Sequence, residues 1–249
     1  MSKNAYHIGC SGYYYPYWKN RFYPQGLAPK DWLAYYSSIF NTVELNGTFY
    51  RTPKLSDLQK YASKTGEQFL FSVKMSRYVT HVLKLKNARQ AIEDFLGLLN
   101  EGLGDKLAHV LFQLPPSFHY TEENLQRVLN AVPNHPGSVV EFRHISWWNK
   151  EVEAALTKTC ITFCNVDFPG LDSVIIHTTG RFYFRFHGNP ELFKSAYSTK
   201  SLQQFAGILK DRENSFVYFN NTYYEAGYTN ASQLAGMLTT GNATSIKKV

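Results

Sequence analysis

Residues 139–148 read V-V-E-F-R-H-I-S-W-W and combine the end of a strand with a charged pair and an aromatic loop. The β-branched residues at the start of this stretch are typical of a buried strand. Strand side chains alternate between two faces, so Glu141 and Arg143 project to the same side. Asn149 and the two residues after it resemble the cap and first turn of a helix. The stretch therefore predicts a strand followed by a helix, with an acid and a base at the carboxyl end of the strand.

Seven further segments have the apolar content and alternation of short strands. They cover residues 6–10, 42–45, 69–73, 108–111, 162–166, 181–186 and 215–219. Segments with helical signals cover residues 29–39, 55–63, 86–100, 121–131, 150–157, 199–210 and 230–238. Eight strands joined by long crossovers predict a TIM-type (β/α)8 barrel, as a single domain over residues 1–249. An open doubly wound sheet fits less well, because no glycine-rich phosphate-binding turn follows a strand.

The composition is that of a folded protein with an excess of basic residues. Of its 249 residues, 44% are hydrophobic and 16% aromatic, which excludes a disordered chain. The net charge of +7 favours an anionic ligand over a cationic one. The basic residues do not form long runs, so we rank a small ligand above duplex nucleic acid.

The cysteines and the apolar segments bear on the cellular compartment. Cys10, Cys160 and Cys164 cannot all pair, and their spacing lacks the second half of a zinc site. The first residues contain no apolar signal core, and no run of about 18 apolar residues is present. We therefore expect a soluble, cytoplasmic protein with free thiols and no membrane contact.

Polar or ionisable residues stand at or just beyond the carboxyl ends of most predicted strands. In a barrel these ends meet at one mouth, where active sites are built. The candidate catalytic residues are Glu44, Glu141 and Asp167. The candidate ligand-binding residues are Lys74, Arg77, Gln113, Arg143, His144, Trp147, Arg185, His187 and Asn220. So many polar groups would be costly to bury without a ligand or ordered water, which favours a functional pocket over a purely structural network.

Seven motifs resemble those of one known family. They are G-C-S-G-Y at 9–13, T-V-E-L-N-G-T-F-Y-R at 42–51, F-S-V-K-M-S-R-Y-V-T-H at 71–81, L-F-Q-L-P-P-S-F at 111–118, V-E-F-R-H-I-S-W at 140–147, F-R-F-H-G at 184–188 and Y-F-N-N at 218–221. In this order and at this spacing they closely resemble the YecE-like family, also called domain of unknown function 72. The resemblance implies a TIM-type barrel and supplies no activity.

The leading functional hypothesis is an enzyme, of the hydrolase or lyase type, that acts on a small anionic ligand such as a sugar or a phosphorylated metabolite. Lys74, Arg143 and Arg185 would hold the anion, and the carboxylates would act as general acid or base. Paired carboxylates also fit glycoside hydrolysis. Cations at the same mouth argue against a glycosidase. They lower the pKa of a neighbouring carboxyl group, whereas a catalytic acid needs a raised pKa.

Three alternatives stay open. Glu44, Glu141, Asp167 and His187 are ligand types found in divalent-metal barrels, but neighbouring arginines compete for them and no metal-binding spacing supports them, so we expect no metal or cofactor. Aromatic residues at 13–18 and 147–148 beside basic residues could stack the bases of single-stranded nucleic acid. A sensor that binds a ligand without turnover would use the same pocket.

Whether Glu141 and Arg143 form a ligand site or a structural ion pair depends on how deeply they are buried. A deeply buried pair would serve stability, and loss of one partner would cost about 3–5 kcal/mol. A pair in an open mouth would instead be hydrated and available to an anion. We expect the second arrangement.

Overall fold

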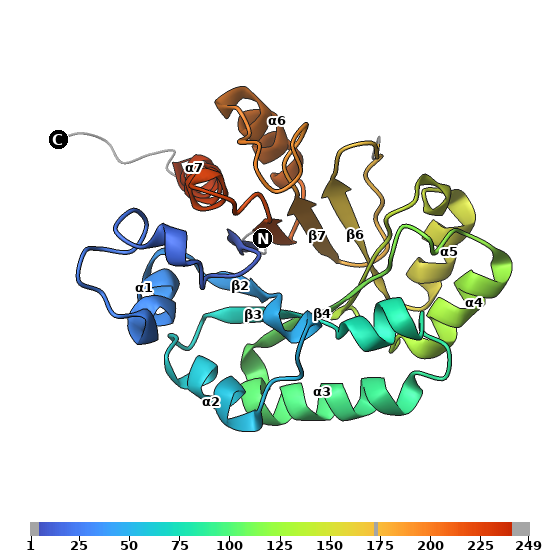
Figure 1. The fold of residues 1–249 in the computed structure, drawn as a ribbon. Helices are drawn as coiled ribbons and strands as arrows, with labels where there is room; N and C mark the ends of the chain where they lie inside the picture. The colour runs from blue at the N-terminus through green and yellow to red at the C-terminus, as the bar shows by residue number, and fades with distance from the viewer. Residues whose placement is uncertain (1–4, 172–173, 241–249) are drawn as a thin grey trace.

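Eight parallel strands form the inner wall of the fold, in the order β1-β8-β7-β6-β5-β4-β3-β2 (Figure 1). The computed structural model describes residues 5–171 and 174–240. The strands are β1 (Ala5–Cys10), β2 (Thr42–Leu45), β3 (Leu70–Lys74), β4 (Leu107–Gln113), β5 (Ser138–Glu141), β6 (Thr162–Asp167), β7 (Arg181–Phe186) and β8 (Asn214–Phe219). With helices outside this wall, the arrangement confirms the predicted TIM-type (β/α)8 barrel.

The wall is nearly closed between β1 and β2, which lie side by side. Just beyond β1, Ser11 forms an isolated parallel bridge with Glu44 of β2. Gly9 permits the approach, because a Cβ atom at this position would lie 2.1 Å from the carbonyl oxygen of Thr42. Closure therefore depends on a glycine in β1 and brings Ser11 next to Glu44 at the carboxyl end of the barrel.

The longer helices cover the outside of the strands (Figure 1). They are α1 (Trp32–Ile39), α2 (Leu55–Ser63), α3 (Arg89–Leu103), α4 (Glu122–Ala131), α5 (Lys150–Lys158), α6 (Thr199–Leu209) and α7 (Ala226–Thr240). Short helical turns are η1 (Pro16–Trp18), η2 (Pro29–Asp31), η3 (Gly47–Phe49), η4 (Tyr78–Val82), η5 (Gly104–Lys106) and η6 (Ile145–Trp147). Within the described ranges, no helix has both the length and the apolar content needed to cross a bilayer.

Local sequence accounts for where these helices begin. Thr121 caps α4 by accepting a hydrogen bond from the Asn124 amide at 3.1 Å, as expected for a threonine before a helix. The predicted helix at 86–100 is present but begins later, at Arg89. Lys84, Leu85 and Asn87 have φ values of 47°, 65° and 50°, which a right-handed helix does not allow. The chain therefore turns before α3 starts.

The β6–β7 connection departs from the repeating pattern, since its described residues, 168–171 and 174–180, contain no α-helix. Asn165 of β6 fixes this connection to the strand. Its side-chain amide donates to the Ile176 carbonyl at 2.9 Å and accepts from the Ile176 amide at 2.8 Å. An extended segment thus covers the outside of β6 where a helix would otherwise lie.

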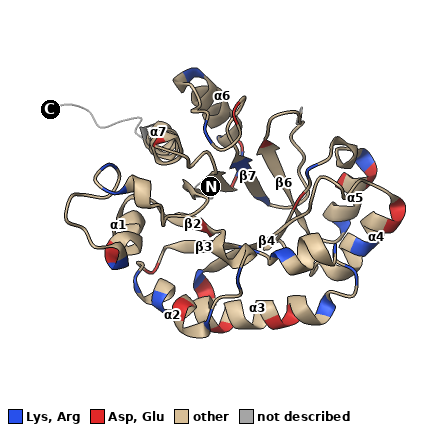
Figure 2. Ribbon diagram, in the orientation of Figure 1, with Lys and Arg blue, Asp and Glu red and all other residues tan. Residues whose placement is uncertain are grey.

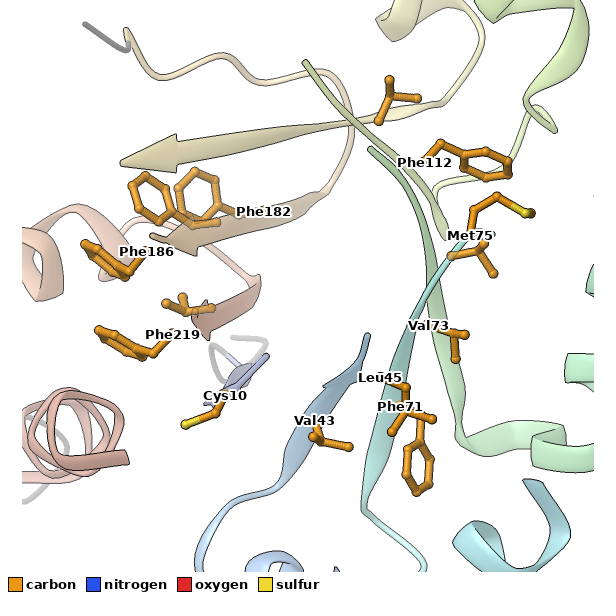
Figure 3. Close-up of a cluster of buried hydrophobic side chains, with 14 of the residues drawn as sticks. Cys10, Val43, Leu45, Phe71, Val73, Met75, Phe112, Phe182, Phe186 and Phe219 are labelled. Atoms are coloured by element: carbon orange, nitrogen blue, oxygen red, sulfur yellow. The ribbon is translucent and has the colours of Figure 1, made fainter. Parts of the chain in front are cut away.

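Two apolar clusters lie on opposite faces of the strands. The larger one fills the space between strands and helices, and Figure 3 shows Val43, Phe71 and Phe186 among its members. The smaller one lies inside the barrel and consists of Leu111, Val139, Cys164, Val166, Tyr183, Phe216 and Tyr218. The barrel interior is thus a packed core in its middle, and its charged side chains are restricted to the two ends.

The amino-terminal end of the barrel is occupied by Arg181 of β7. Its Nη1 donates to the Ala108 carbonyl at 2.9 Å and lies 3.2 Å from His109 Nε2. His109 Nδ1 lies in turn 3.2 Å from Ser72 Oγ. These contacts hold the side chains in place at this end, and the candidate functional residues lie at the opposite, carboxyl end of the barrel.

Candidate functional site

Arg185 connects two buried carboxylates across the carboxyl end of the barrel. Its Nη2 lies 2.6 Å from Glu44 Oε1 on β2, and its Nη1 lies 2.5 Å from Glu141 Oε2 on β5. The side chains of all three residues are 1% exposed or less. Buried carboxylates with short charge-assisted hydrogen bonds are strongly held. This triad is the centre of the site.

Both oxygens of Glu44 are occupied by donors from the surrounding strands. Ser11 Oγ donates to Oε1 at 2.7 Å, and the Tyr183 hydroxyl donates to Oε2 at 2.7 Å. Ser11 reaches Glu44 through the β1–β2 bridge, and Tyr183 lies two residues before Arg185 on the same face of β7. Glu44 is therefore held in place by three donors, Ser11, Tyr183 and Arg185.

Glu141 is ionised and enclosed by cations. Arg143 Nε forms an ion pair with Oε1, and Arg185 Nη1 binds Oε2. Burial alone would raise the pKa of Glu141, but the charges of Arg143 and Arg185 outweigh burial and hold the pKa well below its ordinary value. Glu141 therefore remains a carboxylate at neutral pH and cannot donate a proton as a general acid.

The expectation that Glu141 and Arg143 face an open, hydrated mouth is wrong. Glu141 is 0% exposed, and the side chain of Arg143 is 9% exposed. The Arg143 guanidinium lies 4.3 Å from the centre of the Phe168 ring, which covers it after β6. Arg185, reaching from β7, closes the other side of Glu141. The pair is thus a buried ion pair, in which Arg143 retains the only exposed part, 9% of its side chain.

His187 lies beside these arginines and is neutral. Its Nε2 is 3.2 Å from Arg143 Nη2 and 3.4 Å from Arg185 Nη1. Burial and the charges of the two arginines hold the pKa of His187 well below its ordinary value. Its Nδ1 lies 2.9 Å from the side-chain amide of Asn220, which follows β8. With Asn220 Nδ2 as the donor to Nδ1, the proton of the neutral ring lies on Nε2, which is 3.4 Å from Glu141 Oε1, and His187 adds no charge beside the arginines.

Lys74 brings an amine to the same end of the barrel from β3. Ser72 points inward, where its Oγ lies 2.8 Å from the Tyr218 hydroxyl, and Lys74 follows two residues later on the same face. The Lys74 Nζ lies 4.0 Å from the centre of the Phe49 ring. Burial and the charge of Arg185 lower its pKa to about 8, against the opposing effect of Glu141 and Glu44. Among the described residues, no hydrogen bond or ion pair engages this nitrogen.

The charges of this cluster do not balance when Lys74 is protonated. Three cationic side chains, Lys74, Arg143 and Arg185, face the two carboxylates of Glu44 and Glu141. Glu44 and Glu141 are already paired with arginines, so the excess positive charge resides at Lys74 and the accessible edge of Arg143. A half-buried excess cation favours an anion as its partner.

The structure places other candidates of the sequence outside this cluster. The Asp167 carboxylate accepts a hydrogen bond from Asn189 Nδ2 at 3.0 Å. Gln113 Nε2 is buried and donates to the Leu114 carbonyl at 2.6 Å. His144 stacks on His119, with ring centres 3.9 Å apart. Arg77 is exposed and lines a neighbouring cavity. These residues hold the surrounding loops or surround the mouth.

Trp147, a candidate ligand-binding residue, belongs to the core instead. Its side chain is fully buried and stacks between Phe142 and Phe118, with ring centres 3.9 and 5.5 Å away. The indole Nε1 donates to the Phe118 carbonyl at 2.6 Å. A ring that is covered on both faces and satisfied at its nitrogen has no surface left for a ligand.

Several residues of the cluster were not singled out by the sequence. Ser11 and Tyr183 bind Glu44, and Phe49 contacts Lys74. Cys164 lies with its Sγ 3.9 Å from Glu141 Oε2, and burial raises its thiol pKa well above the ordinary value. Of these residues, Tyr183 alone could have been found from the sequence, because it lies two residues before Arg185 and therefore on the same face of the strand. The other contacts depend on how distant strands meet.

Two cavities flank the mouth on the side of the loop after β2. One, of about 770 Å³, lies between the loops after β1 and β2 and helix α2, and its lining includes Tyr13, Asn46, Tyr50, Lys60 and Tyr61. The other, of about 790 Å³, includes Phe49, Arg77 and Tyr78. Neither cavity is lined by Glu44, Glu141, Lys74 or Arg143, so both lie beside the charged cluster. No group of three metal-ligating side chains occurs in the described part of the chain.

The sequence and the fold were compared with known proteins. The family model described as "Protein of unknown function DUF72" matches residues 7–248. UPF0759 protein YunF of Bacillus subtilis is 32% identical over 135 residues, which cover 51% of this chain and 48% of YunF. UPF0759 protein YecE of Escherichia coli K12 is 27% identical over 146 residues, or 58% of this chain and 53% of YecE. The matched part of this chain thus spans about half the length of these curated relatives.

Solved structures show the same architecture. A DUF72 family protein from Thermotoga maritima, TM1631, superposes with a TM-score of 0.84 at 31% identity, covering 95% of this chain and 100% of that protein. A DUF72 family protein from Enterococcus faecalis superposes with a TM-score of 0.77 at 18% identity, covering 94% of this chain and 96% of that protein, which shows the fold alone. The similarity therefore extends over nearly the whole barrel.

Proposed function

The chain belongs to the DUF72 family of proteins of unknown function, and from this premise we propose that its barrel mouth binds a small anionic metabolite. The observation that carries the proposal is the amine of Lys74, which is half-buried at the end of β3 and has no carboxylate partner of its own. Arg143 adds a second cationic edge. A phosphate or carboxylate group would complete the charge of this site.

The buried triad supports the site as a scaffold. Arg185 holds Glu44 and Glu141 in one arrangement, and Glu141 in turn holds Arg143 through an ion pair. Residues with locked side chains make better binding groups than mobile ones, because less entropy is lost when the ligand arrives. The network thus presents Arg143 and Lys74 in fixed positions toward the mouth.

Within this proposal, proton transfer is assigned to Lys74. The sequence favoured carboxylate general acid–base chemistry, but the lowered pKa of Glu141 makes it a weak base and no acid, and Glu44 is held by donors from Ser11, Tyr183 and Arg185. Asp167 lies apart from the triad, bound to Asn189. A pKa of about 8 lets Lys74 exist in both protonation states near neutral pH. Of hydrolase and lyase chemistry, we favour a lyase, in which the neutral amine of Lys74 removes a proton from the substrate.

Nucleic-acid binding ranks below this proposal. On α2, α3, α4 and α5, positions of Lys or Arg occur together with positions of Asp or Glu, and Figure 2 shows no continuous basic track along these described helices. Such a track is what binding to a phosphate backbone requires. A sensor would use the same mouth, and turnover of the bound ligand is what distinguishes an enzyme from it.

The proposal is tested by a thermal-shift screen of phosphorylated sugars and small carboxylic acids. A ligand at a hundred times its dissociation constant stabilises the folded protein by about 2.7 kcal/mol. Stabilisation is expected in the wild type and in Lys158→Met, whose changed residue is exposed at the end of α5. It is expected to disappear in Lys74→Met. Equal shifts in both variants would refute the site, and the absence of any shift with anionic compounds would refute the ligand class.

A further inference from the structure

We propose that Lys74 forms an imine with the carbonyl group of a small anionic aldehyde or ketone. This inference rests on the proposed anion site and adds to it a covalent step and a substrate class. Lysine amines form such adducts when they are accessible, held in position and available as the neutral amine. Three observations bear on these conditions.

The first observation is the position of the amine. Lys74 is the last residue of β3, so its backbone is fixed in the parallel ladder at the carboxyl end of the barrel, where Lys74 pairs with Leu111 of β4. Its Nζ lies 4.0 Å from the centre of the Phe49 ring in the η3 turn. The Thr48 hydroxyl donates to the Lys74 carbonyl at 2.7 Å and ties that turn to the strand. Strand and turn together direct the amine into the mouth.

The second observation is that this amine differs from other lysines with known contacts. Lys106 Nζ donates to the carbonyls of Ala62 and Thr65 at 2.6 and 2.7 Å. Lys150 lies 3.2 Å from the Glu153 carboxylate on the surface. The Lys74 Nζ contacts an aromatic face instead, and among the described residues no carbonyl or carboxylate oxygen holds its protonated form by a hydrogen bond. Its lone pair is therefore free to react once the proton has left.

The third observation is the charge environment. Arg185 and Arg143 oppose a proton on Lys74, and Glu141 and Glu44 favour it. Because both carboxylates are paired with arginines, burial and the cations prevail and the pKa falls to about 8. About a tenth of the protein then carries a neutral amine at pH 7, compared with less than a thousandth for a lysine of ordinary pKa. His81, with a pKa lowered to about 4, adds no charge beside it.

The step balances within the site. The lone pair of Nζ attacks the carbonyl carbon, the electrons of the C=O π bond move to oxygen, and a proton moves from nitrogen to oxygen to give a carbinolamine. The carbinolamine then loses water, and the C=N bond forms. No oxidant, reductant or further reactant is needed. The accessible edge of Arg143 would bind the phosphate or carboxylate of the same molecule, because its other edge is held by Glu141.

The test uses sodium borohydride, which reduces an imine to a stable secondary amine. The protein is incubated with glyceraldehyde 3-phosphate or with pyruvate, reduced, and digested for peptide mass spectrometry. We expect one dominant adduct, on Lys74, at a level at least tenfold above any surface lysine. The adduct is expected to persist in Lys158→Arg and to be absent in Lys74→Arg, which keeps the charge but not the nucleophile.

Binding of glycerol 3-phosphate, which has no carbonyl group, is measured in parallel by calorimetry, and folding of each variant by its thermal melt. Binding to the wild type and to Lys74→Arg without any adduct would overturn the imine and leave the anion site intact. Adducts spread evenly over surface lysines would also overturn it. If the wild type binds none of the three compounds and forms no adduct, the proposed function itself is contradicted.

Discussion

Glu44 and Arg185 lie 141 residues apart in the sequence and 2.6 Å apart in the structure. The contact crosses the barrel from β2 to β7 and is completed by Glu141 of β5. Because all three groups are buried, each depends on the others for compensation of its charge. This interdependence makes the triad a structural unit and leaves ligand chemistry to its neighbours.

The triad gives a direct prediction about stability. Arg185→Met leaves two carboxylates buried without their shared cation, so it is expected to cost about 3–5 kcal/mol of unfolding free energy in urea titrations. Glu141 keeps Arg143 as its partner, so adding Glu44→Gln alone removes the carboxylate left without a cation and is expected to recover part of the loss. A loss below about 1 kcal/mol for Arg185→Met, typical of exposed pairs, would show that the triad is hydrated.

Glu141 is expected to control the acid limb of the stability curve. Its pKa lies well below the ordinary 4.5 in the folded protein, so the unfolded chain takes up the proton first as the pH falls. The stability from Glu141 is therefore fully present above about pH 5 and is lost below it, at up to about 1.4 kcal/mol per pH unit. Urea titrations between pH 3 and 7 test this. The slope below pH 5 is expected to be smaller in Glu141→Gln, and equal slopes would contradict the assignment.

Trp147 is expected to act through packing alone. Trp147→Ala removes a fully buried indole stacked between two phenylalanines and is expected to cost about 3–5 kcal/mol of stability. At a temperature where the variant is folded, its affinity for anionic ligands is expected to match the wild type. Calorimetry with glycerol 3-phosphate provides the readout. A selective loss of affinity with unchanged stability would return Trp147 to the binding site.

The fold could be predicted from the sequence because the signals for strands and helices are local. Alternation in residues 181–186 and the threonine before α4 each act over a few residues, and the structure reproduces both elements at the predicted positions. The start of α3 shifted because Lys84, Leu85 and Asn87 adopt positive φ values, which side-chain periodicity does not reveal. Prediction of boundaries is weakest where backbone conformation, and not apolar spacing, ends an element.

The candidate site depended on long-range contacts that the sequence does not encode locally. Strand alternation placed Glu141 and Arg143 on one face, and the structure brings them together. Their burial follows from Arg185 and from the Phe168 ring, both supplied by other strands and loops. For the same reason the sequence could not separate Trp147, which packs against Phe118, from a residue of the mouth.

The central claim, that Lys74 makes the mouth an anion site, is tested most directly by the pH dependence of binding. Calorimetric titrations of glycerol 3-phosphate, which has no carbonyl group, are carried out at pH 6.5, 8 and 9.5 with the wild type and Lys74→Arg. Because protonated Lys74 attracts the anion and its pKa is about 8, affinity for the wild type is expected to fall as the pH rises through 8. Lys74→Arg keeps its charge throughout and is expected to show no such fall. Wild-type binding that is independent of pH, or the absence of glycerol 3-phosphate binding at pH 6.5, would contradict the account.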